Sequence, residues 1–163
     1  MVIGLELGSM DELRRAVRTD GFSRLDRRLD RSVATADPGA TLAAIAGAYV
    51  DFAVEHLHLY RAMVVERPPG PEHRNEPDPG ELTFRRLELR VLSGIEQGRF
   101  RVGTPATAQL WAALHGLANL ALAETVAPGQ VRAVLADLLV RLSIGYGDEP
   151  EFGQASVDAS LGL

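Results

Sequence analysis

Three side chains on consecutive turns of one predicted helix are the residues of this sequence best suited to chemistry. Trp111, His115 and Asn119 are spaced four residues apart, in a segment (106–123) that holds no Asp, Glu, Lys or Arg. This spacing places them on one helix face, where polar groups need hydrogen-bond partners if they are buried. Two interpretations are open. Either His115 bonds to a neighbouring helix within an ordinary core, or the three side chains line a cavity in which the indole stacks on a ligand and the polar groups orient it.

A carboxylate on the preceding predicted helix offers a companion group. Glu88 lies on the same face as Phe84 and Val91, rather than among the neighbouring arginines. A carboxylate there either pairs with a cation inside the bundle or contacts a ligand. Together with an aromatic face on the helix over 38–55, these positions predict a pocket for a small, mostly hydrophobic molecule with one or two polar groups. The predicted ligand-binding residues are Tyr49, Phe52, Met63, Phe84, Glu88, Trp111, His115 and Asn119.

The residue patterns of common catalytic and metal sites are absent from the sequence. No H-E-x-x-H motif and no cysteine occurs, so we expect no metal site. No serine lies in a G-x-S-x-G motif, and no glycine-rich phosphate loop follows a predicted strand. Glu88 and His115 could meet across the bundle as an acid–base pair, but no nucleophile or metal accompanies them. We therefore expect no catalytic residues and no cofactor, and we predict that the protein is not an enzyme.

Composition and charge describe a globular protein without a nucleic-acid-binding surface of its own. Of 163 residues, 46% are hydrophobic, and 17 basic residues against 22 acidic ones give a net charge of −5. Many arginines lie between residues 14 and 31, but three aspartates alternate with them, as on a salt-bridged helix face. The alanine- and arginine-rich composition is typical of GC-rich bacterial genomes.

Cellular location can be argued from two further features. The absence of cysteine fits a reducing cytoplasm, and the N-terminal residues do not follow the pattern of a signal peptide. The uncharged segment 106–123 approaches the length of a membrane span. Gln109, His115 and Asn119 are spaced along it, however, so a buried central helix is the better interpretation. We expect a cytoplasmic protein with no membrane contact.

Start and stop signals divide the chain into six predicted helices. A capping box over 9–12 starts the first, Asp37-Pro38 and Asp78-Pro79 start the second and fourth, and Gly98 ends the fourth. These signals predict an all-α, single-domain bundle of about six helices, over about 10–33, 38–55, 57–66, 79–98, 105–127 and 130–145. The proline-rich stretch 67–79 is predicted to be an exposed loop. Residues 147–163, rich in Gly, Asp and Ser, are predicted to be a loose tail.

The last two of these predicted helices are apolar on more than one side. In the sixth, one apolar stripe contains Val134 and Leu135, and a second stripe on the opposite side contains Ala136. The fifth has a face of small residues, which another helix could approach closely. Either these helices are central in a monomer, or a second copy of the chain covers the extra faces; with only six helices we favour a homodimer. The predicted interface residues are Ala112, Gly116, Ala133, Val140 and Ile144.

Three short motifs occur in order along the chain, at residues 7–13 (LGSMDEL), 55–63 (EHLHLYRAM) and 111–116 (WAALHG). Together they resemble the C-terminal domain of tetracycline-repressor (TetR) family transcriptional regulators. The first is similar to the start of the family's fourth helix. The second is similar to the turn between its fifth and sixth helices, although a proline common there is Leu57 in this sequence. The third resembles the Trp…His-Gly signature of one class of these domains. The resemblance covers about residues 7–146, and the six predicted helices correspond to helices four to nine of that fold.

The resemblance implies a dimeric sensor domain of a transcriptional repressor that binds a small-molecule effector. In such proteins the last two helices form a four-helix bundle with the partner subunit, and ligand entry shifts the first helix of the domain. That helix connects to a DNA-binding helix-turn-helix head. Only residues 1–6 precede the match here, so we expect DNA contact only through a head that this chain lacks, either as a fragment or naturally. An alternative is a headless interaction protein that heterodimerises with a full-length regulator. The expected division is a residual segment (1–6), the sensor domain (7–146) and the tail (147–163).

Overall fold

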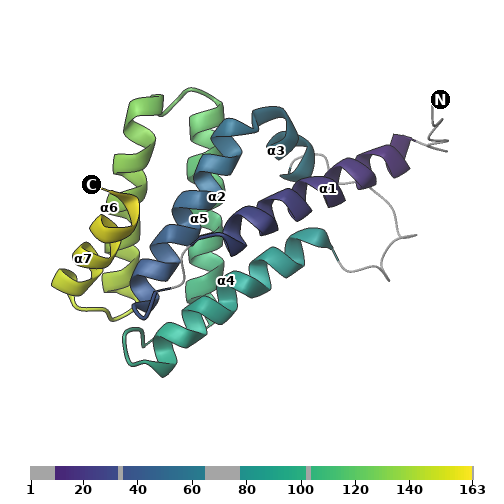
Figure 1. Cartoon of the computed structure of the whole chain (residues 1–163). Helices are drawn as coiled ribbons and strands as arrows, with labels where there is room; N and C mark the ends of the chain where they lie inside the picture. Colours follow the sequence, from purple (N-terminus) through teal and green to yellow (C-terminus); the bar gives the residue numbers. More distant parts are fainter. Residues whose placement is uncertain (1–9, 33–34, 65–77, 102–103, 163) are drawn as a thin grey trace.

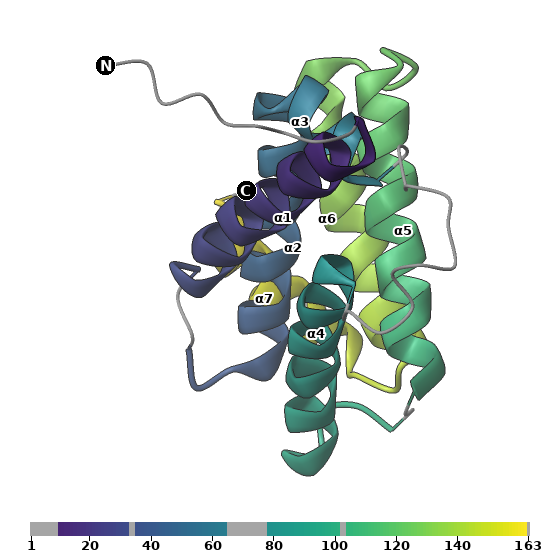
Figure 2. The same cartoon turned by 90° about the vertical axis from the view of Figure 1, so that its right-hand side faces the viewer.

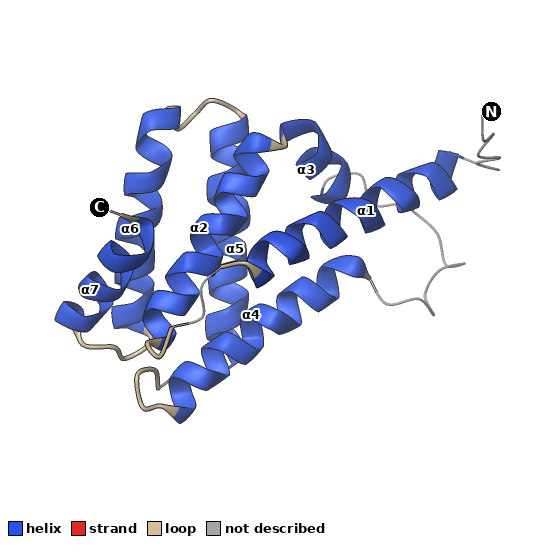
Figure 3. Cartoon of the chain, viewed as in Figure 1, coloured by secondary structure: helices blue, strands red, loops and turns tan. Residues whose placement is uncertain are grey.

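The chain folds as a bundle of helices. The computed structural model describes residues 10–32, 35–64, 78–101 and 104–162, and within these ranges it contains seven helices and no strand (Figures 1 and 3). This confirms the predicted all-α, single-domain architecture. The helices are α1 (Met10–Asp30), α2 (Pro38–Glu55), α3 (Leu57–Val64), α4 (Pro79–Glu96), α5 (Thr104–Leu122), α6 (Pro128–Gly145) and α7 (Pro150–Leu161).

Aspartate–proline pairs start two of the helices, as their sequence predicts. The Asp37 carboxylate accepts a hydrogen bond from the Gly39 N–H at 2.9 Å at the start of α2, and Asp78 accepts one from the Gly80 N–H at 2.8 Å at the start of α4. In each case proline takes the first helical position, where its missing N–H costs nothing. Gly98 has a φ of +75° just beyond α4, a conformation that glycine adopts without strain. The capping box predicted for α1 includes Ser9, which lies outside the described residues.

α2 is the central helix, and its apolar residues are buried on almost every side. It packs against α1, α3, α4, α5, α6 and α7 (Figures 1 and 2). This arrangement explains why most of its residues are Ala, Gly or aliphatic: a helix that is surrounded needs an apolar surface all round. α1 crosses the bundle and packs on α3 and α4. At the crossing with α3, a Cβ added to Gly21 would lie 2.4 Å from the Met63 side chain, so a larger residue here would require Met63 to move.

The expectation of a loose C-terminal tail is wrong for the described part of 147–163. Residues 150–161 form α7, which packs on α2 and α6. Pro150 provides a helix start, and the apolar positions Val157 and Leu161, four residues apart, are buried on one face. The Ser160 hydroxyl also donates a hydrogen bond of 2.7 Å to the Ala40 carbonyl. The Gly, Ser and Asp content that suggested disorder is therefore compatible with a short amphipathic helix.

α6 divides its residues between core and surface differently from the two predicted stripes. Val131 and Leu135 are buried as expected, but Ala136 is buried with them, whereas Val134 is exposed. Val134 and Ala136 each lie at the edge of their predicted stripe, so a small difference in how α6 is turned about its axis decides whether they face the core or the solvent.

Among the described helices, none combines the length and apolar character needed to span a bilayer.

Candidate ligand-binding site

Aromatic side chains from three helices meet in the middle of the bundle. The Trp111 ring on α5 lies 5.5 Å from the Tyr49 ring on α2 and 5.8 Å from the Phe84 ring on α4, the latter in an edge-to-face arrangement. His115, one turn along α5, lies 4.4 Å from Trp111 and 5.4 Å from Tyr49 between ring centroids. Aromatic pairs at such distances favour these offset geometries over face-to-face stacks. We call Tyr49, Tyr60, Trp111 and His115 the aromatic cluster.

A directed chain of hydrogen bonds connects the polar atoms of the aromatic cluster. His115 Nδ1 lies 3.0 Å from the Trp111 carbonyl oxygen, which can only accept, so Nδ1 carries the proton. His115 Nε2 is then an acceptor, and the Tyr49 hydroxyl donates a hydrogen bond to it over an O···N distance of 3.1 Å. The Tyr49 oxygen in turn accepts from the Tyr60 hydroxyl at 3.1 Å. The chain therefore runs from Tyr60 through Tyr49 to His115 and ends on the main chain.

Burial keeps every member of this hydrogen-bond chain neutral. Desolvation lowers the pKa of His115, and the hydrogen bond to the Trp111 carbonyl only partly opposes this effect. Desolvation also raises the pKa of both Tyr49 and Tyr60 above the ordinary value of tyrosine. The cluster is thus a set of uncharged donors and acceptors rather than an acid–base pair. Of the two interpretations of His115 left open by the sequence, the structure supports a histidine with satisfied hydrogen bonds, which also lies at a cavity.

One cavity, here called cavity 1, lies between α1, α2, α4 and α5. It has a volume of about 260 Å³, and its deep wall is formed by buried apolar residues such as Ile45, Leu87 and Leu114 together with Tyr49 and one side of Trp111. Its outer part is charged. The exposed lining residues are Asp30, Arg86, Arg90 and Leu89, while Leu29 and Thr83 belong to the buried lining.

A second cavity, cavity 2, also reaches Trp111. It has a volume of about 370 Å³ and lies near the start of α4, with Trp111, His115 and Phe84 on one side and Arg18, Phe22 and Asp78 on the other. Trp111 therefore contributes to the walls of both cavities. A side chain in this position can respond to occupation of either one.

Four of the eight predicted ligand-binding residues line these cavities. Tyr49 and Trp111 line cavity 1, and Phe84, Trp111 and His115 line cavity 2. The structure thus brings together residues that the sequence places on three different predicted helices.

The other four predicted residues lie outside both cavities. Phe52 is buried against the His56 ring at 4.8 Å, and Met63 is buried beneath Gly21. Glu88 is half-buried on α4, and Asn119 is exposed, with its amide donating to the His115 carbonyl at 2.8 Å. A helix face can be assigned from sequence, but the depth of a residue along the helix relative to a cavity cannot.

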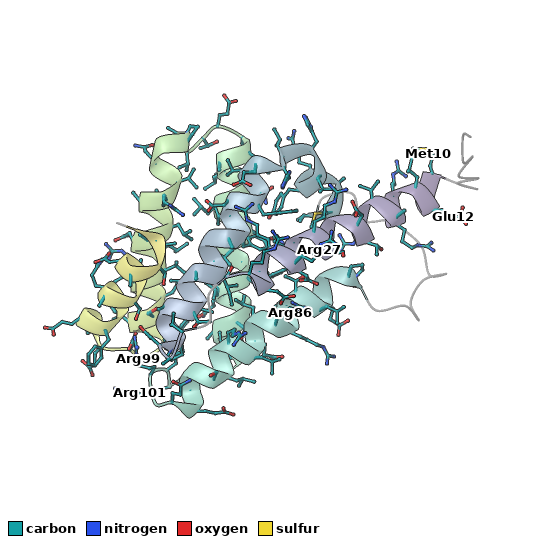
Figure 4. All side chains as sticks on the ribbon, viewed as in Figure 1. Met10, Glu12, Arg27, Arg86, Arg99 and Arg101 are labelled. Atoms are coloured by element: carbon teal, nitrogen blue, oxygen red, sulfur yellow. The ribbon has the colours of Figure 1, made fainter. Side chains whose placement is uncertain are left out.

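The sequence did not predict the charged residues of cavity 1. Asp30 is exposed, in agreement with a salt-bridged face on α1, but it pairs with Arg86 of α4. Asp26 also contacts α4, where it accepts a hydrogen bond from the Thr83 hydroxyl at 2.8 Å. Arg86 lies on the side of α4 that faces α1 (Figure 4). The i, i+4 spacing of the two aspartates indicates a common face, and it is the available sequence signal for this contact.

A polar cluster at the opposite end of the bundle was also not predicted. The Arg99 guanidinium binds both carboxylate oxygens of Asp148, at 2.7 and 2.8 Å, and also Asp37 at 2.6 Å. Ser156 of α7 donates to Asp37 at 2.6 Å and accepts from Arg99 at 3.1 Å. Figure 4 shows Arg99 at this end of the molecule, near the start of α2 and α7. We call these four residues the Arg99 cluster.

Electrostatics reinforce the Arg99 cluster. The hydrogen bond and charge of Asp148 raise the pKa of Arg99 despite the opposing effect of burial. Burial alone raises the pKa of Asp37, but hydrogen bonds from Ser156 and Gly39 and the charge of Arg99 outweigh it, so that the pKa of Asp37 is lowered. Arg99 and Asp37 are therefore held in their charged, paired forms. Among the described residues, no group of three or more His, Cys, Asp or Glu side chains is arranged to hold a metal ion.

Comparison with known proteins places this arrangement in context. Residues 42–142, more than half of the chain, match the family described as tetracyclin repressor-like, C-terminal domain. A solved structure of a protein with unknown function from Rhodococcus sp. RHA1 has the same fold, with a TM-score of 0.78 and 24% identity over 88% of this chain and 76% of that one. No curated protein matches the chain.

Proposed function

Because this chain belongs to the family of tetracycline repressor-like C-terminal domains, we propose that it is the effector-sensing and dimerisation domain of a transcriptional repressor. The observation that carries the proposal is the position of Trp111, which lines two cavities at the centre of a domain of this regulator family. Domains of this kind bind ligands and dimerise, and they are not enzymes. DNA contact would require a helix-turn-helix head, and a regulator of transcription would act in the cytoplasm.

The effector we propose is a small, mostly hydrophobic molecule. The buried walls of cavity 1 are aliphatic and aromatic, which is typical of small-molecule sites. Its volume of about 260 Å³ lies just below the usual range for drug-sized ligands, roughly 300–1,000 Å³. Of the four cavity-lining residues predicted from sequence, we propose that Tyr49 and Trp111 contact an effector in cavity 1, while Phe84 and His115 line cavity 2. An effector would act by preferring one arrangement of the domain over another, since equal affinity for both shifts no population.

A homodimer through α5 and α6 is the second part of the proposal. Ala112 and Gly116 on α5, and Ala133 and Ile144 on α6, are exposed, whereas Val140 is half-buried against the core. A Cβ added to Gly116 would meet nothing within 4 Å in the single chain, so no contact inside the subunit requires glycine there. Small residues on an exposed helix allow a second helix to approach closely, and a symmetric pair is the commonest way to cover such a face.

Ligand sensing can be tested by a thermal-shift screen of small hydrophobic molecules. We expect at least one compound to raise the Tm of the wild type and to lose this effect in Trp111→Phe and Trp111→Ala. Phe152→Ala is the matched control, since this exposed aromatic residue lies on α7, away from both cavities. If no compound stabilises the wild type, or if stabilisation survives both Trp111 substitutions, the proposed sensor site is contradicted.

Dimerisation can be tested with a pair of glycine substitutions. Gly116→Leu places a large side chain on the proposed interface and should shift sedimentation towards a monomer that retains its helical circular dichroism. Gly129→Leu is the control, because Gly129 is equally open in the single chain but lies in the first turn of α6, outside the proposed interface. A wild type that sediments as a monomer at high concentration would rule out the homodimer.

A further inference from the structure

The outer part of cavity 1 carries an excess of positive charge. Arg86 and Arg90 of α4 and Asp30 of α1 are the charged residues that line it, giving two guanidinium groups and one carboxylate. Arg86 pairs with Asp30. Among the described residues, Arg90 has neither an ion-pair nor a hydrogen-bond partner. Within the part of the chain that the structure describes, one cationic charge at this cavity is therefore left without a counter-charge.

The buried lining of cavity 1 is mostly apolar, with Thr83 and Tyr49 as its polar residues. Leu87 and Leu114 are almost completely buried, and the half-buried Trp111 contributes the indole ring to the wall. The arginines themselves are exposed. The cavity thus has an apolar depth and a cationic mouth, a division that matches a molecule with one apolar part and one anionic end.

We propose that cavity 1 binds a small amphipathic carboxylate, with its acid group at Arg90 and Arg86 and its apolar part against Leu87, Leu114 and Trp111. A guanidinium group presents paired donors that fit the two oxygens of a carboxylate. The single negative charge of such a ligand would balance the positive charge of Arg90. The inference rests on the proposed function and adds to it the charge of the effector.

Asp30 would compete with a bound carboxylate for Arg86. Its carboxylate occupies Arg86, and it also repels a second anion in the same place. A bound acid therefore shares Arg86 with Asp30 and weakens an ion pair between α1 and α4. Removal of the Asp30 charge should consequently strengthen the binding of a carboxylate, although it removes a native ion pair.

The single tryptophan of the sequence provides a direct binding signal, because Trp111 lies in the wall of the cavity. We would titrate the full chain with octanoate and 3-phenylpropionate, and with the primary amide of each, and follow Trp111 fluorescence. The two shapes test a flexible and a flat apolar part, while each amide keeps the shape and removes the charge. We expect at least one carboxylate to bind about tenfold more tightly than its amide, as expected for hydrogen bonds to a charged group.

Charge variants separate the proposed contacts from general electrostatics. Arg90→Gln should weaken carboxylate binding about fivefold and leave amide binding unchanged. Arg85→Gln is its control, since Arg85 is exposed on the same helix and pairs with Glu81. Asp30→Asn should strengthen carboxylate binding about threefold. Asp20→Asn is its control, because Asp20 pairs with Arg24 on the exposed part of α1.

The outcomes distinguish this inference from the proposed function. If the amides bind as tightly as the carboxylates, or if Arg90→Gln and Arg85→Gln behave alike, the carboxylate site is overturned while a hydrophobic effector site stands. If neither carboxylate binds but neutral hydrophobic compounds from the thermal-shift screen do, the same conclusion holds. If no compound of either kind changes Trp111 fluorescence or the Tm, the proposed function fails as well.

Discussion

The Arg99 cluster and the aromatic cluster are both polar and largely buried, yet they are built on opposite principles. In the Arg99 cluster, one cation is enclosed by two carboxylates and a hydroxyl at hydrogen-bond distance, and the Asp148 side chain is only 2% exposed. In the aromatic cluster, all groups are neutral, and cavities lie beside them. The first arrangement fixes one geometry strongly. The second leaves room for a molecule to enter.

The difference indicates which part of the domain provides stability and which part is adaptable. The Arg99 cluster joins three segments at one end of the bundle: the start of α2, the turn that follows α4, and α7 with the turn before it. The cavities lie towards α1 and the start of α4. We therefore expect substitutions at the Arg99 end to cost mainly stability, and substitutions around Trp111 to cost mainly ligand response.

The largest effect should come from Arg99→Ala. Removal of the guanidinium leaves Asp148, which is almost fully buried, without its bidentate partner. Loss of one partner of a buried ion pair costs about 3–5 kcal/mol, which corresponds to a fall in Tm of roughly 10 °C for a domain of this size. Chemical unfolding would measure the loss in the free energy of unfolding. Arg101→Ala is the control, because this exposed residue is 4.0 Å from Glu149 and its removal should change the stability little. Equal stability of the two variants would contradict the stabilising role that we assign to the Arg99 cluster.

A smaller loss is expected from Leu161→Ala in α7. Leu161 is buried against α2 near Gly47. Truncation of a buried leucine creates a cavity, and we expect a cost of about 2–3 kcal/mol in the free energy of unfolding. Gln154→Ala on the exposed side of α7 should change it by less than about 0.5 kcal/mol. A Leu161→Ala protein as stable as the Gln154→Ala control would mean that α7 contributes little to the fold.

Within the aromatic cluster, removal of a hydroxyl should cost less still. Tyr49→Phe leaves His115 Nε2 without its donor and Tyr60 without its acceptor, so we expect a loss of about 1–2 kcal/mol. Tyr60→Phe removes only the first donor of the chain and should cost about half as much. Urea unfolding of both variants would compare them. The reverse order of stability would contradict the direction that we assign to the hydrogen bonds.

The smallest effect is the pH dependence due to His115. Burial lowers its pKa in the folded state, so the unfolded chain binds more protons as pH falls through the ordinary histidine pKa. The stability contribution of neutral His115 is fully present above that pKa and decreases as the solution becomes more acidic, towards the lower pKa of the folded state. Unfolding of wild type and His115→Gln at pH 7.5 and pH 5.5 should show a larger loss for the wild type. Identical losses would show that His115 is not held neutral by the fold.

Local signals in the sequence were sufficient for much of the fold. Asp37-Pro38 and Asp78-Pro79 start helices because capping depends on a few neighbouring residues. α7 was missed although Pro150 gives a similar signal, because its Gly and Ser content outweighed two apolar positions in the interpretation. The site was predicted in part: Tyr49, Phe84, Trp111 and His115 converge through the helix faces that the sequence defines.

Contacts between distant residues could not be predicted in the same way. Residues 37, 99, 148 and 156 form one cluster, but their separation along the chain gives no periodic pattern. The charge of Asp30 and Arg86 suggested solvent exposure for each residue alone, and only the packing of α1 on α4 brings them to a cavity. Long-range polar contacts depend on the whole set of helix positions, which a helix-by-helix analysis does not define.

The close approach of Gly21 to Met63 has a mechanical consequence for α1. Because the two helices touch there without space for a Cβ, this contact can serve as a fulcrum for α1. From Gly21 back to Met10 the helix extends about 16 Å, and its first turn projects beyond α3 (Figure 1). A tilt of about 10° around the fulcrum would displace Met10 by about 3 Å. Asp30 lies about 14 Å from Gly21 on the other side, so a movement where Asp30 meets Arg86 is transmitted to Met10 at similar size and in the opposite direction.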